Sequence, residues 1–435
     1  MKLIKLTVLV CMMMGYSCRN KQQPQETTAI KVEIKKENGN YSLYRDGKPY
    51  QFNGAGLEFG DIKKLQDNGG NSIRTWRTDN GQETGQEVLD NALRHGCTVT
   101  MCLEMARERH GFDYDDRQAV AHQFNSLKQE VLKYKDHPAL IAWAIGNELN
   151  LGYTNPKVYD AVNKISVMIH QLDPNHLTTT TTAGINQQVV DDIKSRAPDI
   201  DFLSIQLYGD LVNLPNYIKE TNWTKPYMVT EWGAVGHWEV DKTSWGAPIE
   251  NTSTEKAQYY LKGYQSAIAP YSDQCIGSYV FLWGQKQERT PTWYGMFLET
   301  GESTESIDAM YYLWNGQWPE NRAPRVDSLK LDGKSAFASI YLSPQQDYSA
   351  EVFLFDHEGD TINFVWEIKP ESTDLKEGGD FEITPQNIEG LFEQPANSML
   401  TFTAPFEEGS YRLFVYAYDG NENAAHANIP FYVSK

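Results

Sequence analysis

The sequence has few cysteines, few basic residues and no long hydrophobic run. Its 435 residues include 5 Cys, none in a CxxC pair, which argues against a disulfide scaffold or a zinc site. No apolar stretch reaches the roughly 20 residues that a membrane-spanning helix needs. Acidic residues outnumber basic ones, 58 to 39, and the formal net charge is −19. Nucleic acid and anionic membranes, which bind basic patches, are therefore not expected partners.

The 9 histidines show no HExxH or similar ligand spacing, so we expect no catalytic metal and no cofactor. Aromatic residues are abundant, with 11 Trp and 25 Tyr. Such residues form sugar-stacking surfaces in many proteins, although large cores also use them. The composition is compatible with a neutral polysaccharide or oligosaccharide as the partner.

The N-terminus has the pattern of a targeting segment. Two lysines precede a short apolar run at residues 6–14, which is too short to span a bilayer. The next residues resemble a bacterial lipoprotein signal, with Cys18 as the lipidated first residue of the mature chain. We expect residues 1–17 to be removed and residues 18–40 to form a tether and lead-in. The protein would then be a lipoprotein of the cell envelope that touches the membrane only through its anchor. A plain secretory signal is the alternative.

Strand-like and helix-like segments alternate from residue 41 to residue 318. Apolar or β-branched runs, such as residues 140–148 and 177–184, are followed by amphipathic segments, such as residues 158–174. Eight such pairs are typical of a (β/α)8 TIM barrel, an α/β fold.

The pattern changes after this region. Residues 319–327 contain two prolines and have the character of a linker. Short alternating strands separated by turn residues then occupy residues 328–435, which predicts a C-terminal immunoglobulin-like antiparallel β-sandwich. Glycan binding and a role as spacer and stabiliser both stay open for this domain; its aromatic residues form no sharp pattern for a glycan-binding face, which favours the spacer.

Two glutamates end short apolar runs that are typical of buried strands. Glu148 directly follows Asn147 at the end of residues 140–148, and Glu231 lies near the end of residues 226–233. The segment between them has room for about three βα units, since one unit takes ~30 residues. Both carboxylates are then expected at the carboxyl-terminal rim of the barrel, on strands 4 and 7. Glycoside hydrolysis requires such a pair. A single glutamate at the end of a strand is often only a salt-bridge partner, but two glutamates at this spacing favour a catalytic pair.

The neighbouring residue types suggest a different role for each glutamate. The apolar strand before Glu148 suits a general acid, because burial and a like-charged neighbour keep a carboxyl group protonated near neutral pH. Arg74 and Tyr208 are expected near Glu231, where a cation and a hydroxyl favour an ionised nucleophile.

These motifs together resemble those of glycoside hydrolase clan A, over about residues 41–315. The resemblance implies that Glu148 is the acid/base, that Glu231 is the nucleophile, and that the anomeric configuration is retained. It also implies that Asn147 hydrogen-bonds the 2-hydroxyl of the sugar next to the cleaved bond, and that Arg74 contacts the nucleophile.

The same resemblance gives roles to residues on later strands. Tyr208 matches the clan tyrosine that contacts the nucleophile, and Gln206 lies where relatives often carry Asn or His. Trp283, in the run VFLWG, matches the tryptophan that forms the floor of the sugar site. Further candidates for substrate binding lie after the predicted strands, and each is equally plausible as a packing residue: Trp76, Glu104, Trp238, Trp245 and Trp293.

Within the clan, the barrel, the lipoprotein signal and the C-terminal sandwich look most like glycoside hydrolase family 158. That family comprises endo-β-1,3-glucanases of gut Bacteroidetes that act on laminarin-type glucans. The resemblance implies a retaining endo-β-1,3-glucanase in polysaccharide degradation. We expect the protein to be a monomer. Families 2 and 5 share the same strand ends, so other β-linked glycans stay open: mannan, other β-glucans and β-galactosides. A β-glucan transglycosylase, a noncatalytic surface glycan-binding lipoprotein, and exo rather than endo action also stay open.

Overall fold

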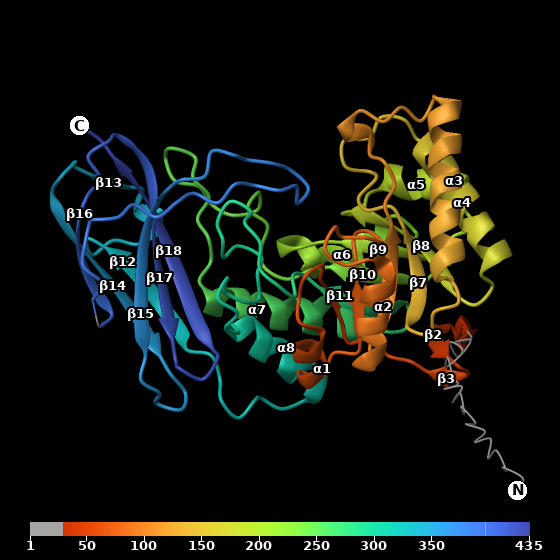
Figure 1. Cartoon of the computed structure of the whole chain (residues 1–435), viewed down its shortest axis with the longest axis horizontal. Helices are drawn as coiled ribbons and strands as arrows, with labels where there is room; N and C mark the ends of the chain where they lie inside the picture. The colour runs from red at the N-terminus through yellow and green to blue at the C-terminus, as the bar shows by residue number, and fades with distance from the viewer. Residues whose placement is uncertain (1–28, 396) are drawn as a thin grey trace, which may run out of the picture.

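The computed structural model describes residues 29–395 and 397–435, which form a barrel and a sandwich lying side by side (Figure 1). The expected signal segment and Cys18 fall outside the described residues. Within the described part of the chain, no helix combines the length and apolar character needed to cross a membrane. The three cysteines in this part are buried and free.

Eight parallel strands close into a barrel, which confirms the predicted fold class. In chain order they are β4 (Gly54–Gly56), β5 (Ser72–Arg74), β6 (Thr98–Leu103), β7 (Leu140–Ile145), β8 (Leu177–Ala183), β9 (Phe202–Gln206), β10 (Tyr227–Glu231) and β11 (Cys275–Val280). The strands are buried along almost their whole length, as expected for a parallel sheet covered by helices.

Helices follow the barrel strands and cover the outer face of the barrel. They are α1 (Ile62–Asp67), α2 (Gly85–Arg94), α3 (Arg117–Tyr134), α4 (Lys157–Leu172), α5 (Gln187–Arg196), α6 (Leu214–Glu220), α7 (Ser253–Gly263) and α8 (Glu305–Asn315). Local sequence signals fix several of their ends. Thr84 and Glu87 form a capping box at the start of α2, and Thr252 and Glu255 form one at the start of α7. Gly316 ends α8 in the left-handed conformation.

A small antiparallel sheet precedes the barrel and begins inside the segment expected to be a tether and lead-in. It consists of β1 (Val32–Glu37), β2 (Asn40–Arg45) and β3 (Lys48–Pro49). Val32 and Leu43 pack in one apolar cluster with residues at the starts of barrel strands, including Phe202 and Met228. The sheet therefore covers the amino-terminal end of the barrel, opposite the rim that carries Glu231.

The C-terminal domain consists of two sheets, as predicted. One sheet contains β12 (Arg325–Leu331), β14 (Asp347–Phe355) and β16 (Met399–Thr403), and the other contains β13 (Ile340–Leu342), β18 (Ala424–Val433), β17 (Gly409–Tyr418) and β15 (Asn363–Pro370). Their inner faces share one apolar core, in which Trp366 is fully buried. All strand pairs are antiparallel except β13 with β18, which is parallel.

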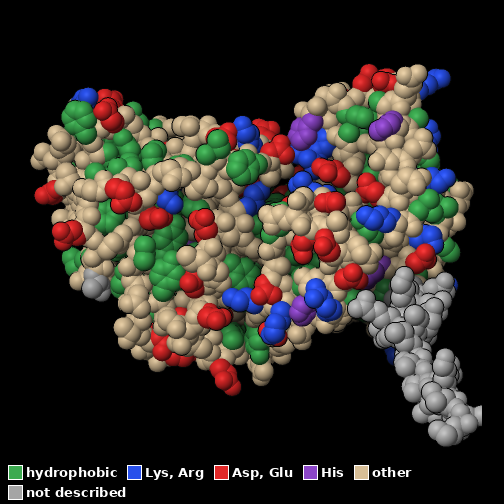
Figure 2. All heavy atoms as spheres, viewed as in Figure 1, with side chains coloured by type: hydrophobic (Ala, Val, Ile, Leu, Met, Phe, Trp, Pro, Cys, Tyr) green, Lys and Arg blue, Asp and Glu red, His purple; other side chains and the backbone are tan. Residues whose placement is uncertain are grey.

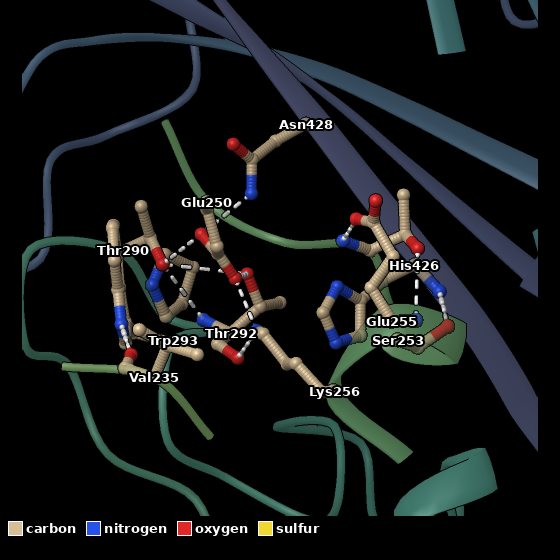
Figure 3. A network of polar contacts seen from close by, with 12 residues as sticks. Val235, Glu250, Ser253, Glu255, Lys256, Thr290, Thr292, Trp293, His426 and Asn428 are labelled. Atoms are coloured by element: carbon tan, nitrogen blue, oxygen red, sulfur yellow. Dashed lines mark hydrogen bonds and ion pairs between the residues drawn. The ribbon is translucent and has the colours of Figure 1, made fainter. Parts of the chain in front are cut away.

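A buried polar network joins the two domains (Figure 3). The carboxylate of Glu250 accepts hydrogen bonds from Lys256 at 2.5 Å, Thr290 at 2.6 Å and Thr292 at 2.8 Å, all in the barrel domain. It also accepts one at 2.6 Å from Asn428 of β18, in the sandwich. Burial raises the pKa of Glu250, but the Lys256 ammonium and these donors more than offset that effect and lower the pKa to about 2.

We expect Glu250→Gln to lower the free energy of unfolding by about 3–5 kcal/mol at pH 7, because the Lys256 ammonium stays buried without a compensating charge. Since the folded-state pKa of Glu250 lies below the ordinary 4.5, the carboxylate contributes stability above pH 4.5. That contribution is lost as the pH falls toward 2. Denaturant unfolding at several pH values measures both effects. Glu408→Gln, at an exposed site, is the matched charge control. A loss as small as in that control would contradict a role for the pair in the junction.

Candidate active site

The carboxyl ends of four barrel strands bring the predicted polar residues together. Arg74, Gln206 and Glu231 are the last residues of β5, β9 and β10. Asn147 and Glu148 follow β7 by two and three residues. All of these residues except Arg74 line one cleft, and Arg74 lies directly beneath it, bonded to Glu231. The side chains therefore meet at the rim of the barrel where active sites of this fold form.

The Glu231 carboxylate is surrounded by donors. Its Oε1 accepts hydrogen bonds from Arg74 at 2.6 Å, Trp76 Nε1 at 2.7 Å and Gln206 Nε2 at 2.9 Å. Its Oε2 accepts one from the Tyr208 hydroxyl at 2.8 Å. Burial, followed by the Glu231 charge, raises the pKa of Tyr208 well above its usual value, so this phenol keeps its proton and donates. Four donors, one of them the buried Arg74 guanidinium, therefore converge on this carboxylate.

The side chain of Asn147 is oriented by its amide oxygen. That oxygen accepts hydrogen bonds from Arg74 and from Gln206 at 2.8 Å. Because these two donors occupy both lone pairs of the oxygen, the amide NH2 group is the part of Asn147 left to donate toward the cleft. Arg74 contacts both Asn147 and Glu231 and so fixes these two side chains relative to each other.

Glu148 lies in a tight turn after β7. Gly146 has φ of +73°, and a Cβ there would come within 2.6 Å of Leu149, so the turn requires glycine. Glu148 itself has φ of +51°, an uncommon conformation for a side chain of its size. The Thr181 hydroxyl from the β-branched strand β8 donates to the Gly146 carbonyl and accepts from the Glu148 amide. The neighbouring strand thus stabilises the strained turn that directs Glu148.

The environment of Glu148 is opposite to that of Glu231. Burial, and next the negative charge of Glu231, raise the pKa of Glu148 to about 7, while Arg109, Arg74 and Arg107 partly oppose this rise. The site therefore holds one carboxylate on which four donors converge and one carboxyl group whose pKa lies near neutral pH. Two carboxyls with such different environments are suited to a nucleophile and a general acid.

The cleft has a volume of about 1260 Å³. This exceeds the roughly 300–1000 Å³ typical of pockets for one small molecule, so it has room for several linked sugar units. Trp76, Tyr208, Phe281 and Tyr294 form a cluster of edge-to-face aromatic rings on its wall beside Glu231. Figure 2 shows acidic and basic side chains intermingled around the hollow between the two domains.

Two further predicted residues, Glu104 and Trp238, also line the cleft, and the Trp238 ring is 57% exposed. Two predicted tryptophans lie elsewhere. Trp245 packs on Tyr341 and Tyr432 of the sandwich and does not line the cleft. Trp293 is buried, and its Nε1 donates to the Val235 carbonyl at 2.9 Å. Both indole rings therefore pack against neighbouring residues, which is one of the two roles that the sequence left open for them.

The expectation for Trp283 needs a correction. The residue borders the cleft, but its side chain is fully buried, between Phe297 and Trp314. Its Nε1 donates to the Asp61 carbonyl at 3.1 Å. The indole has no free face for a sugar, because α8 and the loop after β4 cover it. Trp76, which donates to Glu231, provides the indole nearest to the carboxylates.

Several residues of the cleft were not expected from the sequence. Arg107 lies beside the turn after β7, and its Nε donates to the Asn147 carbonyl at 3.3 Å. A segment of the sandwich, residues 377–382, also lines the cleft. One available signal was the long connection between β15 and β16, since long loops in compact domains often carry function.

Among the described residues, one group of carboxylates has the spacing of a metal site: Asp356, Asp360 and Asp419, with ligand oxygens within 4.8 Å of one another. The group lies in the sandwich and does not line the cleft. Asn321 and Asn421 donate to Asp360 at 2.8 and 2.9 Å.

Comparison with known proteins finds similarity to glycoside hydrolases over part of the chain. Residues 59–266 match the model of the glycosyl hydrolases family 2, TIM barrel domain. The matched segment contains Arg74, Asn147, Glu148, Tyr208 and Glu231.

Curated relatives match shorter stretches. The mannan endo-1,4-beta-mannosidase F of Aspergillus clavatus is 36% identical over 97 residues, which are 19% of this chain and 22% of that protein. The probable mannan endo-1,4-beta-mannosidase F of Aspergillus flavus is 28% identical over 165 residues, 32% of this chain and 36% of that protein. The chain thus spans only 22% and 36% of the length of these relatives.

Solved structures share the fold. The β-D-glucuronidase of Dictyoglomus thermophilum has a TM-score of 0.51 and 16% identity, over 66% of this chain and 54% of that chain. The β-glucuronidase of Bifidobacterium dentium has a TM-score of 0.51 and 17% identity, over 66% of this chain and 49% of that chain. At these identities the likeness shows the barrel architecture alone.

Proposed function

We propose that this protein is a retaining glycoside hydrolase that cleaves a β-linked glycan by double displacement. Glu231 attacks the anomeric carbon as the nucleophile. Glu148 donates its proton to the leaving oxygen and then, as a carboxylate, removes a proton from the attacking water. The observation that carries the proposal is the contrast between the two carboxyls: four donors hold Glu231, while the pKa of Glu148 is raised to about 7.

The surrounding residues support this chemistry. The free NH2 group of Asn147 would donate to a hydroxyl of the sugar next to the cleaved bond. Arg74, Tyr208, Trp76 and Gln206 would keep Glu231 in position for the attack. A hydrogen bond to the 2-hydroxyl that strengthens in the transition state lowers the barrier by stabilising the developing charge.

For the substrate we propose β-1,3-glucan of the laminarin type first, because of the resemblance to family 158. β-1,4-Mannan is the second candidate, because the curated relatives are named as mannan endo-1,4-β-mannosidases. The volume of the cleft suits either chain.

The test is a product profile of the chain lacking its expected signal segment, incubated separately with laminarin, β-mannan, other β-glucans and β-galactosides. Glu148→Gln is the matched control. A ladder of short oligosaccharides from one polymer, absent in the control, identifies the substrate and endo action, whereas a single short product indicates exo action. Products longer than the substrate indicate transglycosylation. Binding without turnover on every polymer contradicts the hydrolase and favours a glycan-binding protein.

Tyr208→Phe is expected to lower kcat by about 10- to 100-fold, since it removes one charge-assisted hydrogen bond from Glu231 and leaves the ring in place. Tyr153→Phe is the matched control, because Tyr153 also donates to a carboxylate, that of Asp192, but lies outside the cleft. Steady-state kinetics on the identified substrate measures the effect. Equal, small effects of both substitutions would contradict the role of Tyr208.

We further propose that Cys18 carries the lipid that attaches the protein to the cell envelope. Expression of the whole chain in a lipoprotein-processing bacterium, followed by membrane fractionation, tests this. Cys18→Ser should move the protein out of the membrane fraction, and an unchanged distribution would exclude the anchor.

A further inference from the structure

The connection between β15 and β16 leaves the sandwich and reaches the mouth of the barrel, as the blue segment in Figure 1 shows. We name residues 376–384 of this connection the strap. Seven strap residues line the same cleft as the two catalytic glutamates: Glu377, Gly378, Gly379, Asp380, Phe381, Glu382 and Thr384. Gly378 and Gly379 have φ of +62° and +74°, which gives the strap its turn at the cleft.

One edge of the strap is fixed to the loop after β11. The buried Glu382 carboxylate accepts hydrogen bonds from the Arg289 amide at 2.6 Å and from its guanidinium at 2.5 Å. Arg289 also donates to the Lys376 carbonyl at 3.0 Å, and Lys286 donates to the Gly379 carbonyl at 3.0 Å. A buried ion pair with several hydrogen bonds keeps this edge in one position.

The other edge of the strap contacts the loop after β6. Asp380 lies 3.1 Å from His110 Nε2, and Arg109 donates to the Gly378 carbonyl at 3.5 Å. Arg107 lies 4.0 Å from Asp380 and also donates to the Asn147 carbonyl, next to Glu148. The strap therefore connects two separate barrel loops across the cleft. Arg107, which contacts the strap, also bonds to Asn147, the residue directly before Glu148 in the turn.

Phe381 lies between these two fixed edges and is 82% exposed. Its backbone neighbours, Asp380 and Glu382, are both paired, yet its ring belongs to none of the aromatic pairs or apolar clusters among the described residues. An exposed phenyl ring adds little buried apolar area and therefore little stability to the fold. Such a ring on a backbone held in one position is typical of a binding surface. Two other exposed aromatics line the same cleft, Phe59 at 58% and Trp238 at 57%.

We infer that the strap makes the sandwich part of the substrate-binding cleft, and that Phe381 stacks on a sugar unit remote from the cleaved bond. The inference rests on the proposed function and assigns the sandwich a role in binding beyond that of a spacer. A sugar ring presents C–H groups on one face, and an aromatic ring already held in place binds that face at little entropic cost. Short substrates do not reach such a subsite, so its contribution depends on the length of the glycan.

The test compares Phe381→Ala with the unmodified full-length mature chain on β-1,3-gluco-oligosaccharides and β-1,4-manno-oligosaccharides of two to six units. We expect kcat/KM to fall about tenfold on the longest substrates of the series that is cleaved, mostly through KM, and by less than about twofold on the shortest. Phe381→Trp should restore the rate. Ile383→Ala is the matched control, because Ile383 is an apolar strap residue, 65% exposed, that does not line the cleft.

Each outcome separates the inference from the proposed function. Because the ring of Phe381 is mostly exposed, its removal should leave the melting temperature unchanged, and a reduced rate then reports binding. An unchanged rate in Phe381→Ala, or an equal loss at every chain length, would overturn the subsite while the hydrolase stands. If the unmodified chain cleaves neither these oligosaccharides nor any polymer of the product profile, the proposed function fails and the subsite fails with it.

Discussion

Glu231→Ala is expected to lower kcat by about four to six orders of magnitude, since removal of a nucleophile costs this much in enzymes whose catalytic groups act as a unit. The substitution removes the group on which four donors converge, from Arg74, Trp76, Gln206 and Tyr208. It also leaves the buried Arg74 guanidinium without its carboxylate, so circular dichroism should first establish that the variant is folded.

Azide gives this variant a specific readout. In Glu231→Ala the small anion can enter the space of the lost carboxylate, attack the anomeric carbon and yield a glycosyl azide of inverted configuration. Rescue with that product assigns the nucleophile to Glu231. The same rescue in Glu148→Ala, and none in Glu231→Ala, would reverse the two roles.

The second large effect is a dependence on pH that belongs to Glu148. Burial and the charge of Glu231 raise the pKa of Glu148 to about 7, above the ordinary 4.5. The first step needs the protonated form, so kcat/KM should be high below pH 7 and fall as the pH rises through about 7. Glu148→Gln should lose about 10²–10⁴-fold in rate and should lack this alkaline decline, because its amide does not titrate.

The measurement is a profile of kcat/KM between pH 4 and pH 9 for the unmodified chain and for Glu148→Gln, with an unactivated oligosaccharide. An aryl glycoside with an activated leaving group is the comparison substrate. Its leaving oxygen needs little protonation, so Glu148→Gln should slow the first step far less with this substrate. An alkaline decline that persists in Glu148→Gln would contradict the assignment of the acid.

The sequence predicted the barrel well because the strands that define it carry strong signals. The apolar run LIAWAI before Asn147 and the β-branched run LTTTTTA are buried on both faces in the structure, as parallel strands require. Since the carboxyl ends of parallel strands meet at one rim, the order of strands was enough to bring Asn147, Glu148 and Glu231 together. The proximity of these three residues thus follows from the order of the parallel strands in the barrel.

The sequence did not determine which rim aromatics face the cleft. Trp76 and Trp283 both follow barrel strands, yet Trp76 donates to Glu231 whereas Trp283 is buried between Phe297 and Trp314. The difference depends on α8, which packs over the end of β11, and such packing between distant segments leaves no local pattern. The length of the connection between β15 and β16 pointed to a functional loop, but not to the cleft, since the partner of Glu382 is Arg289 in the other domain.

The most direct test of the central claim follows the anomeric proton of the first product by NMR during hydrolysis of the identified substrate. The double displacement through Glu231 predicts that the β-anomer appears first and that the α-anomer grows in only by mutarotation. If the α-anomer appears first, hydrolysis inverts the configuration, and Glu231 would not be a nucleophile.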